Sequence, residues 1–434
     1  MQYPPRLVTG IVVFLTIAAL YTINSISARD PTSVFFNSRK AYAPRYSAIR
    51  QQQAEAFIAA YNDAKTPKVI KASKDDEKRK LCVGISSTKR EGAGYLSDTV
   101  GSLLAGLTAD ERQEIYLIVF IPHSKPETHS AYTEKWLPGL VDEVLTYDFG
   151  MDRMQYIRNM EQEGGRLIEK GLFDYAYLLS KCAEQFTPYI AIFEDDTVAM
   201  DGWYHRTMAA LHESEQQAAL RRSKPDFLYL RLFYTEEFLG WRSQYWKSYL
   251  WRSLCVAAIP TALMLFVRVF QPRTKLSMTL TTPRAFLVLY AGLAVLILFY
   301  FSLGRFTVHS ISAGVHEMPR FGCCSQAFVF PNLKAQDLVA YFKERHIGYV
   351  DVVLEDFADE RDALRFAVTP SIVQHVGRES GKGDEDGSLR KWGRSAEGKI
   401  WSFGFEKCDW RVLRREHEEV VRLRGQAASS ATAT

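Results

Sequence analysis

Three long apolar runs interrupt an otherwise mixed pattern of hydrophobic and polar residues. They cover residues 7–23, 253–270 and 285–303. A helix that crosses a bilayer needs ~20 predominantly apolar residues, and each run approaches that length. We therefore expect a short cytosolic tail (1–6), a transmembrane anchor (7–24) and a transmembrane hairpin (249–303). The competing interpretations are a cleaved signal peptide for the first run and a pair of buried core helices for the other two.

The loop between the second and third runs is basic. It carries Arg273, Lys275 and Arg284 and has no acidic residue. Positively charged loops stay on the cytosolic side of a membrane, so the sequence on either side of the hairpin is expected in the lumen of a secretory organelle. The lumenal parts are then a stem (25–80), two globular segments (81–248 and 304–415) and a C-terminal tail (416–434).

Both globular segments alternate between strand-like and helix-like patterns, which is typical of an α/β fold. Helices are predicted at 95–107, 166–185 and 335–345, and residues 376–400 are predicted to form a loop. Neither segment alone has enough strands for a mostly parallel sheet covered by helices on both faces. We therefore predict one α/β domain that is split by the hairpin. The expected strands are 81–87, 115–121, 141–146, 189–193, 227–233, 327–330 and 371–375.

Composition narrows the class of protein. Of the 434 residues, 47% are hydrophobic and 24% are charged, so most of the chain should fold around a core. The net charge of +4 gives no reason to expect a nucleic-acid partner. The six cysteines form no CxxC pair and show no zinc-binding spacing. Disulfides are possible in an oxidising lumen, but the sequence leaves their pairing open.

The most informative polar feature is Glu194-Asp195-Asp196, directly after the predicted strand 189–193. Open α/β sheets bind ligands outside the carboxyl ends of their strands. Three adjacent carboxylates repel one another unless a cation is bound, and Mn²⁺ or Mg²⁺ prefers such oxygen ligands. The metal would also neutralise a departing diphosphate. The alternative is a solvated acidic turn.

Each of the other candidate site residues also has an interpretation without a role in the chemistry. His375 could reach a metal through a neutral ring nitrogen, or it could be a structural histidine. Asp351 and Glu355 could remove a proton from an acceptor hydroxyl, or they could be charges on a helix surface. Glu236, Glu237 and Trp241 lie in an aromatic stretch that suits either a sugar-binding wall or an anchor at the membrane interface.

Four segments carry a family resemblance. Residues 231–241 followed at once by the hairpin, together with 323–331 and 370–377, resemble the post-GPI attachment to proteins factor 4 family. Residues 370–377 and 350–355 are also similar to N-acetylglucosaminyltransferase IV, and the acidic triplet resembles the DXD motif of GT-A glycosyltransferases. The resemblance covers residues 81–415 and all three apolar runs. It implies a GT-A-like, Rossmann-type fold in a multi-pass Golgi membrane enzyme with a lumenal catalytic domain.

The resemblance also implies an activity. The family transfers N-acetylgalactosamine from UDP-GalNAc to the first mannose of the GPI-anchor glycan. The acceptor would be a GPI lipid or a GPI-anchored protein, and the transfer would be inverting and dependent on Mn²⁺ (or Mg²⁺). The sequence leaves two alternatives open: an N-glycan N-acetylglucosaminyltransferase and a catalytically silent membrane adaptor.

Residue roles follow from the same resemblance. Asp195 and Asp196 would bind the metal and the UDP diphosphate, Glu194 would support them, and His375 would be a further ligand. Glu355 is the first choice for the catalytic base and Asp351 the second. The remaining expected site residues are Ser86, Ser87, Thr88 and Arg90 for the nucleotide sugar, and Glu236, Glu237 and Trp241 for the acceptor.

Overall fold

The computed structural model describes residues 14, 17–18, 20–65, 69–90, 94–162, 166–222, 226–241, 243–318, 323–377 and 400–432. The chain forms two compact units. The sheet unit comprises Pro44–Thr235 and Ser312–Thr434, and the helical unit comprises Met1–Ala43 and Glu236–Ile311. Most of the predicted N-terminal anchor and residues 378–399 of the predicted loop lie outside the described residues.

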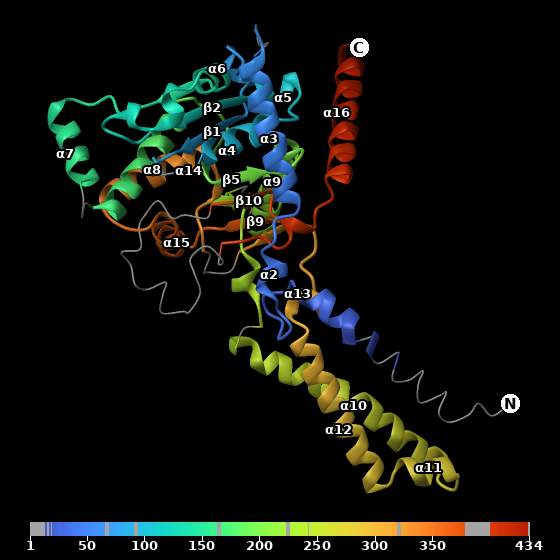
Figure 1. The fold of residues 1–434 in the computed structure, drawn as a ribbon. Helices are drawn as coiled ribbons and strands as arrows, with labels where there is room; N and C mark the ends of the chain where they lie inside the picture. The colour runs from blue at the N-terminus through green and yellow to red at the C-terminus, as the bar shows by residue number, and fades with distance from the viewer. Residues whose placement is uncertain are drawn as a thin grey trace. The chain divides into compact units, whose positions relative to one another are not determined.

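An eight-stranded sheet forms the centre of the sheet unit, in the order β3-β2-β1-β4-β8-β6-β9-β7. Figure 1 labels β1, β2 and β9 of this sheet. The four neighbouring strands β3, β2, β1 and β4 run parallel to one another. In contrast, β8 runs antiparallel to β4 and β6, and β7 runs antiparallel to β9. A smaller sheet pairs β5 (Thr197–Ala199) with β10 (Val373–His375). The strands of the large sheet are β1 (Leu81–Ser86), β2 (Ile115–Phe120), β3 (Glu143–Leu145), β4 (Tyr189–Glu194), β6 (Tyr229–Arg231), β7 (Gly314–Glu317), β8 (Ala327–Pro331) and β9 (Arg365–Thr369).

The sequence on both sides of the helical unit contributes to this sheet, because β8 lies between β4 and β6. The α/β class is therefore confirmed, but the prediction of a mostly parallel sheet is wrong for its second half. A chain that returns from a long excursion needs no short crossover helix, and such crossovers are what keep consecutive strands parallel. β7 and β9 were not predicted because neither is a continuous apolar run: β7 contains His316 and Glu317, and β9 begins and ends with polar residues.

Helices cover both faces of the sheet. β1 shows why, since Cys82 packs into one core with Leu178 and Phe328, whereas Val83 packs into the other core with Val100. A strand buried on both faces reads as a continuous apolar run, which is why β1 could be predicted. The helices of this unit are α3 (Tyr46–Asp63), α4 (Tyr95–Leu104), α5 (Ala109–Gln113), α6 (Trp136–Leu140), α7 (Met151–Glu161), α8 (Leu167–Ala183), α9 (Trp203–Arg222), α14 (Asn332–Arg345), α15 (Val350–Glu360) and α16 (Trp410–Thr432).

Two disulfides resolve the pairing that the sequence left open. Cys82 of β1 is bonded to Cys182 of α8, with their Cα atoms 5.6 Å apart. Cys323 is bonded to its neighbour Cys324. Cys255 and Cys408 are free thiols. The first bond fixes a covering helix to the central strand of the sheet.

The polar helix near residue 50 belongs to the sheet unit and is not part of a free stem. Arg50 is fully buried in α3, where its guanidinium donates to the carbonyls of Ala199 and Ser102, both at 2.7 Å. It also pairs with Asp201 at 2.9 Å. Similarly, α16 runs through the predicted domain boundary at residues 415 and 416. Both differences arise because polar residues make specific contacts that a pattern of polarity cannot show.

The helical unit contains α10 (Trp246–Phe270) and α12 (Pro283–Ser302), joined through α11 (Lys275–Leu280) (Figure 1). Ser243–Phe270 and Pro283–Ser302 are long and apolar enough to cross a membrane. Apolar side chains such as Ile259 and Leu287 are largely exposed on them. The unit also contains α2 (Ser38–Ala41) and α13 (Arg305–Val308).

Arg50 provides a test of the packing of α3. We expect Arg50→Met to lower the free energy of unfolding of the full chain by about 3–5 kcal/mol, because it leaves Asp201 buried without its partner. Denaturant unfolding followed by tryptophan fluorescence would measure this. Arg422→Met is the matched control, since Arg422 pairs with Glu419 in solvent and should change stability by only about 0–1 kcal/mol. Equal midpoints for the two variants would contradict the assignment.

Candidate functional site

The acidic triplet lies where two neighbouring parallel strands end. Ser86 of β1 is in register with Glu194 of β4, and both face the same edge of the sheet. Thr99 of α4 holds the turn that follows, because its hydroxyl lies 2.7 Å from the carbonyls of both Asp195 and Thr197. The Val376 amide donates to the Asp196 carbonyl at 2.8 Å. The turn is therefore fixed from two sides.

Asp195 is buried and has two close partners. The Ser87 hydroxyl donates to its Oδ2 at 2.6 Å, and Arg90 Nη2 lies 2.8 Å from its Oδ1. Burial raises the pKa of Asp195, Arg90 opposes that rise, and the neighbouring charge of Asp196 adds to it. The net result is a carboxyl whose ionised form is disfavoured by its surroundings.

Asp196 is equally buried but behaves in the opposite way. Burial acts to raise its pKa, yet the hydrogen bond and charge of His375, together with Arg90, outweigh burial and lower it. His375 Nε2 lies 3.4 Å and Arg90 Nη2 3.1 Å from its Oδ2. Its Oδ1 is buried and has no hydrogen-bond partner among the described residues. Two adjacent carboxylates are thus placed in different protonation environments.

His375 of β10 faces the triplet. Its Nδ1 lies 3.2 Å from the Ile400 carbonyl, which leaves Nε2 directed at Asp196. Burial lowers the pKa of His375, but Asp196 outweighs burial and the pKa is raised. Gly377 lies so close that an added Cβ would be 2.5 Å from Asp196 Oδ2 and 2.9 Å from His375 Nε2. A side chain at position 377 would therefore cover both groups.

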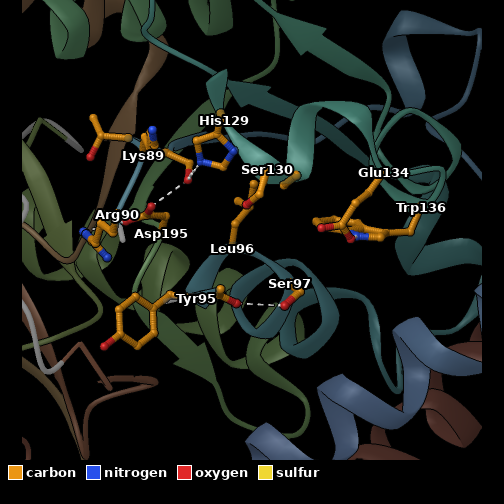
Figure 2. A pocket seen from close by; sticks show the side chains of 14 residues that line it. Lys89, Arg90, Tyr95, Leu96, Ser97, His129, Ser130, Glu134, Trp136 and Asp195 are labelled. Carbon is orange, nitrogen blue, oxygen red and sulfur yellow. Dashed lines mark hydrogen bonds and ion pairs between the residues drawn. The ribbon is translucent and has the colours of Figure 1, made fainter. Parts of the chain in front are cut away.

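A pocket opens beside Asp195, between the loop after β1 and the start of α4 (Figure 2). Ser87, Thr88 and Arg90, three of the four residues expected in the nucleotide-binding loop, line it, and their role in binding stays a prediction. Arg90 Nε and Nη1 are buried without hydrogen-bond partners among the described residues. Such donors suit the oxygens of a phosphate.

His129 also lines the pocket and was not predicted. Its Nε2 lies 3.0 Å from Ser87 Oγ, so Asp195, Ser87 and His129 form one chain of hydrogen bonds (Figure 2). Burial lowers the pKa of His129, so the ring is neutral near pH 7. With Ser87 donating to Asp195, the His129 tautomer that fits carries its proton on Nε2. His129 lies far from every motif in the sequence, and no local pattern would have found it.

Glu194 has a separate role from its two neighbours. Its carboxylate accepts from the Ser325 hydroxyl at 2.5 Å and from Gln326 Nε2 at 3.0 Å. The same short segment donates from the Cys324 amide to Asp351 Oδ2 at 3.1 Å. Residues 323–326 therefore link the acidic triplet to the candidate base Asp351 on α15.

Glu355 lies one helical turn beyond Asp351 and is fully engaged. Its Oε1 accepts from the Tyr229 hydroxyl at 2.5 Å and from Arg231 Nη2 at 3.0 Å. Its Oε2 pairs with Arg365. This network ties α15 to β6 and β9. A helical pattern with a charged face could not distinguish such an anchor from a catalytic base.

The predicted acceptor residues Glu236, Glu237 and Trp241 belong to the helical unit. Trp241 Nε1 donates to the Phe301 carbonyl at 3.1 Å, and its ring packs against Tyr249 and Phe301. Trp241 is thus part of the packing at the base of α10 and α12. A role for these residues toward an acceptor stays a prediction.

Comparison with known families identifies the class of protein. The family model described as GPI-N-acetylgalactosamine transferase PGAP4 matches residues 81–374, which include the triplet, the pocket loop and α15. The chain belongs to this family. The GPI-N-acetylgalactosamine transferase family is a family of glycosyltransferases, and the mixed α/β sheet is compatible with a GT-A-like fold.

Two curated relatives carry a related name. The chain is 25% identical over 171 residues to the mouse (Mus musculus) alpha-1,3-mannosyl-glycoprotein 4-beta-N-acetylglucosaminyltransferase C, over 35% of this chain and 36% of the relative. The Macaca fascicularis protein of the same name is 24% identical over the same lengths. The chain thus spans about a third of these relatives, which are also glycosyltransferases by name.

The triplet gathers oxygen and nitrogen atoms of the kinds that bind divalent cations, and a metal site here stays a prediction. Asp195, Asp196 and His375 offer carboxylate oxygens and a ring nitrogen within one buried corner, and Asp196 Oδ1 has no other partner among the described residues. Mn²⁺ accepts such mixed oxygen and nitrogen ligands, and Mg²⁺ accepts the oxygens. Arg90 supplies the positive charge between the two carboxylates.

The opposite pKa shifts predict opposite effects on stability. The ionised form of Asp195 destabilises the fold as pH rises above its unfolded pKa of ~3.9, so Asp195→Asn should raise the melting temperature at pH 8 and change it little near pH 4. Asp196 stabilises the fold above that pH, and the contribution is lost on acidification, so Asp196→Asn should lower the melting temperature at pH 8. Thermal unfolding with a chelator present would measure both, and shifts of the same sign would refute the pairing.

Proposed function

We propose that this protein transfers N-acetylgalactosamine from UDP-GalNAc to a mannose of the GPI-anchor glycan. The observation that carries the proposal is the family match over residues 81–374, which covers both halves of the large sheet, the triplet and the pocket loop and ends one residue before His375. The named family supplies the donor and the acceptor class. The arrangement of the site supplies the physical reasons below.

The pocket beside Asp195 is the proposed donor site. The loop after β1 presents Ser87, Thr88 and Arg90. Arg90 Nε and Nη1, which are buried and have no hydrogen-bond partner in the part of the chain that the structure describes, would bind the diphosphate. Asp195, Asp196 and His375 would hold Mn²⁺ or Mg²⁺, which when bound neutralises the charge that develops on the departing UDP. His129 would keep Ser87, and through it Asp195, in one orientation.

An inverting transfer needs a base on the acceptor side. The acceptor oxygen forms a bond to C1 of the sugar as the bond from C1 to the diphosphate breaks, and the base takes the hydroxyl proton. The contacts favour Asp351, because both oxygens of Glu355 are already paired with arginines. Glu355 would then act as a positioning residue that orients α15.

Membrane attachment supports a lipid-linked acceptor. The apolar helices Ser243–Phe270 and Pro283–Ser302 would cross the membrane with the basic loop in the cytosol, and an N-terminal anchor would precede them. The two disulfides suit an oxidising lumen, consistent with a Golgi enzyme. A catalytic unit with a membrane hairpin in mid-sequence stays close to the bilayer, where a GPI glycan lies.

An N-glycan N-acetylglucosaminyltransferase is the second candidate, because the two curated relatives carry that activity in their names. The two functions use different donors. Turnover of UDP-GlcNAc on an N-glycan acceptor, without turnover of UDP-GalNAc on a GPI, would favour this alternative.

The metal and donor assignments are tested with the purified full chain. We expect turnover of UDP-GalNAc with a GPI acceptor, dependent on added Mn²⁺, and a loss of at least ~100-fold in Asp196→Ala, since even outer partners of a metal site are worth ~10–100-fold. Asp362→Asn is the control, because Asp362 is exposed and should leave turnover unchanged. Equal turnover in a chelator, or full activity of Asp196→Ala, would overturn the site.

The choice of base is tested by two conservative variants. Asp351→Asn should lower kcat by ~10²–10⁴-fold with little change in melting temperature, since a general base contributes that much. Glu355→Gln should lower the melting temperature, because it unbalances Arg231 and Arg365. An active Asp351→Asn beside a stable, inactive Glu355→Gln would instead identify Glu355 as the base.

A further inference from the structure

A second cluster of metal-ligating side chains lies on elements that do not line the donor pocket. Glu111 of α5, His205 of α9 and His417 of α16 each place one ligand atom within 4.8 Å of the others. All three residues are at least nine-tenths buried. Nothing in the proposed transfer reaction uses them.

His205 is the residue that needs an explanation. It is 6% exposed, and neither ring nitrogen has a hydrogen-bond partner among the described residues. The nearest acceptor, Glu416 Oε1, lies 3.6 Å from Nε2, beyond hydrogen-bonding distance. Burial, His417 and Arg206 together lower the pKa of His205 to about 4, so the ring is neutral and offers a lone pair. A buried polar group without a partner is costly unless something occupies it.

The residues around His205 allow a second histidine ring to lie close to it. The His417 ring stacks on it with centroids 5.1 Å apart and an angle of 18° between the planes. Gly202 has a φ of +67°, and a Cβ there would lie 2.3 Å from His205 Cε1. Only glycine fits at this position, so the backbone leaves the space that the two rings need.

Two glutamates, Glu111 and Glu416, lie beside the two histidines. His417 Nε2 lies 3.0 and 2.9 Å from the two carboxylate oxygens of Glu111, and the Thr108 amide donates to the same carboxylate at 3.0 Å. Glu416 pairs with Arg206 through Oε2, which leaves Oε1 directed at His205. Ligands ~2.0–2.1 Å from a tetrahedral zinc ion are ~3.3 Å from one another, close to the separations seen here.

We propose that Glu111, His205 and His417 form a structural zinc site. Two imidazoles with a carboxylate suit zinc, whereas Mg²⁺ and Ca²⁺ prefer oxygen ligands alone. The site would fasten α16 to α5 and to the first turn of α9. It is independent of the proposed transferase activity and of the triplet.

Metal content is the first test. The purified full chain is stripped with a chelator, incubated with zinc chloride and desalted, and bound zinc is measured by mass spectrometry. We expect about one equivalent in the wild type and in Asp196→Ala, and binding at least ~100-fold weaker in His205→Ala. His212→Ala is the matched control, because His212 is an exposed histidine on the same helix and should leave the zinc in place. Loss of zinc in Asp196→Ala with retention in His205→Ala would overturn the proposal.

Two further measurements keep the proposal testable if His205→Ala does not fold. Cobalt added to the stripped wild type should give the visible absorption of a tetrahedral ion with nitrogen and oxygen ligands. Zinc should raise the melting temperature of the wild type and protect residues 410–432 from proteolysis. Sub-stoichiometric zinc, the absence of a tetrahedral cobalt spectrum, or no protection of α16 by zinc would each refute the site.

Discussion

The sheet unit must keep two adjacent carboxylates buried beneath one arginine, and the arrangement of its other elements depends on this. Asp195 and Asp196 repel each other, and burial disfavours both charges. Arg90 lies against both, while Ser87 and His375 each bind one of them. The strands β1, β4 and β10 and the helix α4 bring these groups together, so the fold serves to hold a charge arrangement that would not assemble in water. Proteins commonly give up stability at such functional sites.

The contacts also separate groups that look alike in sequence. Glu194 is adjacent to Asp195 but binds Ser325 and Gln326, so it links the triplet to the segment that precedes β8. Asp351 and Glu355 lie on one face of α15, yet Glu355 is enclosed by arginines whereas Asp351 accepts from two backbone amides. Residues of the same type thus differ in whether charged side chains or backbone amides hold their carboxylates. The acidic pattern alone could not show this difference.

The sequence predicts the parts of the fold that depend on continuous apolar runs. β1, β2, β4 and the two long helices of the helical unit are of this kind, as is the placement of the triplet at a strand end. The short strands β7 and β9, the incorporation of α3 through Arg50, and the site partner His129 depend on contacts between residues distant in sequence. The antiparallel β8 belongs to the same group. Local pattern carries no information about such contacts, because it cannot show which distant segment supplies the partner.

The position of β8 has a consequence for how the protein is made. β4 and β6 precede Glu236–Ile311 of the helical unit in the chain, but the strand that lies between them follows this segment. During synthesis, the edges of these two strands that pair with β8 therefore remain unpaired until residues beyond 312 have been made. Unpaired strand edges are prone to aggregation, and pairing between distant segments is slow. The sheet can close only after the apolar helices have been synthesised, so biogenesis of the long helices and folding of the catalytic sheet are coupled in time.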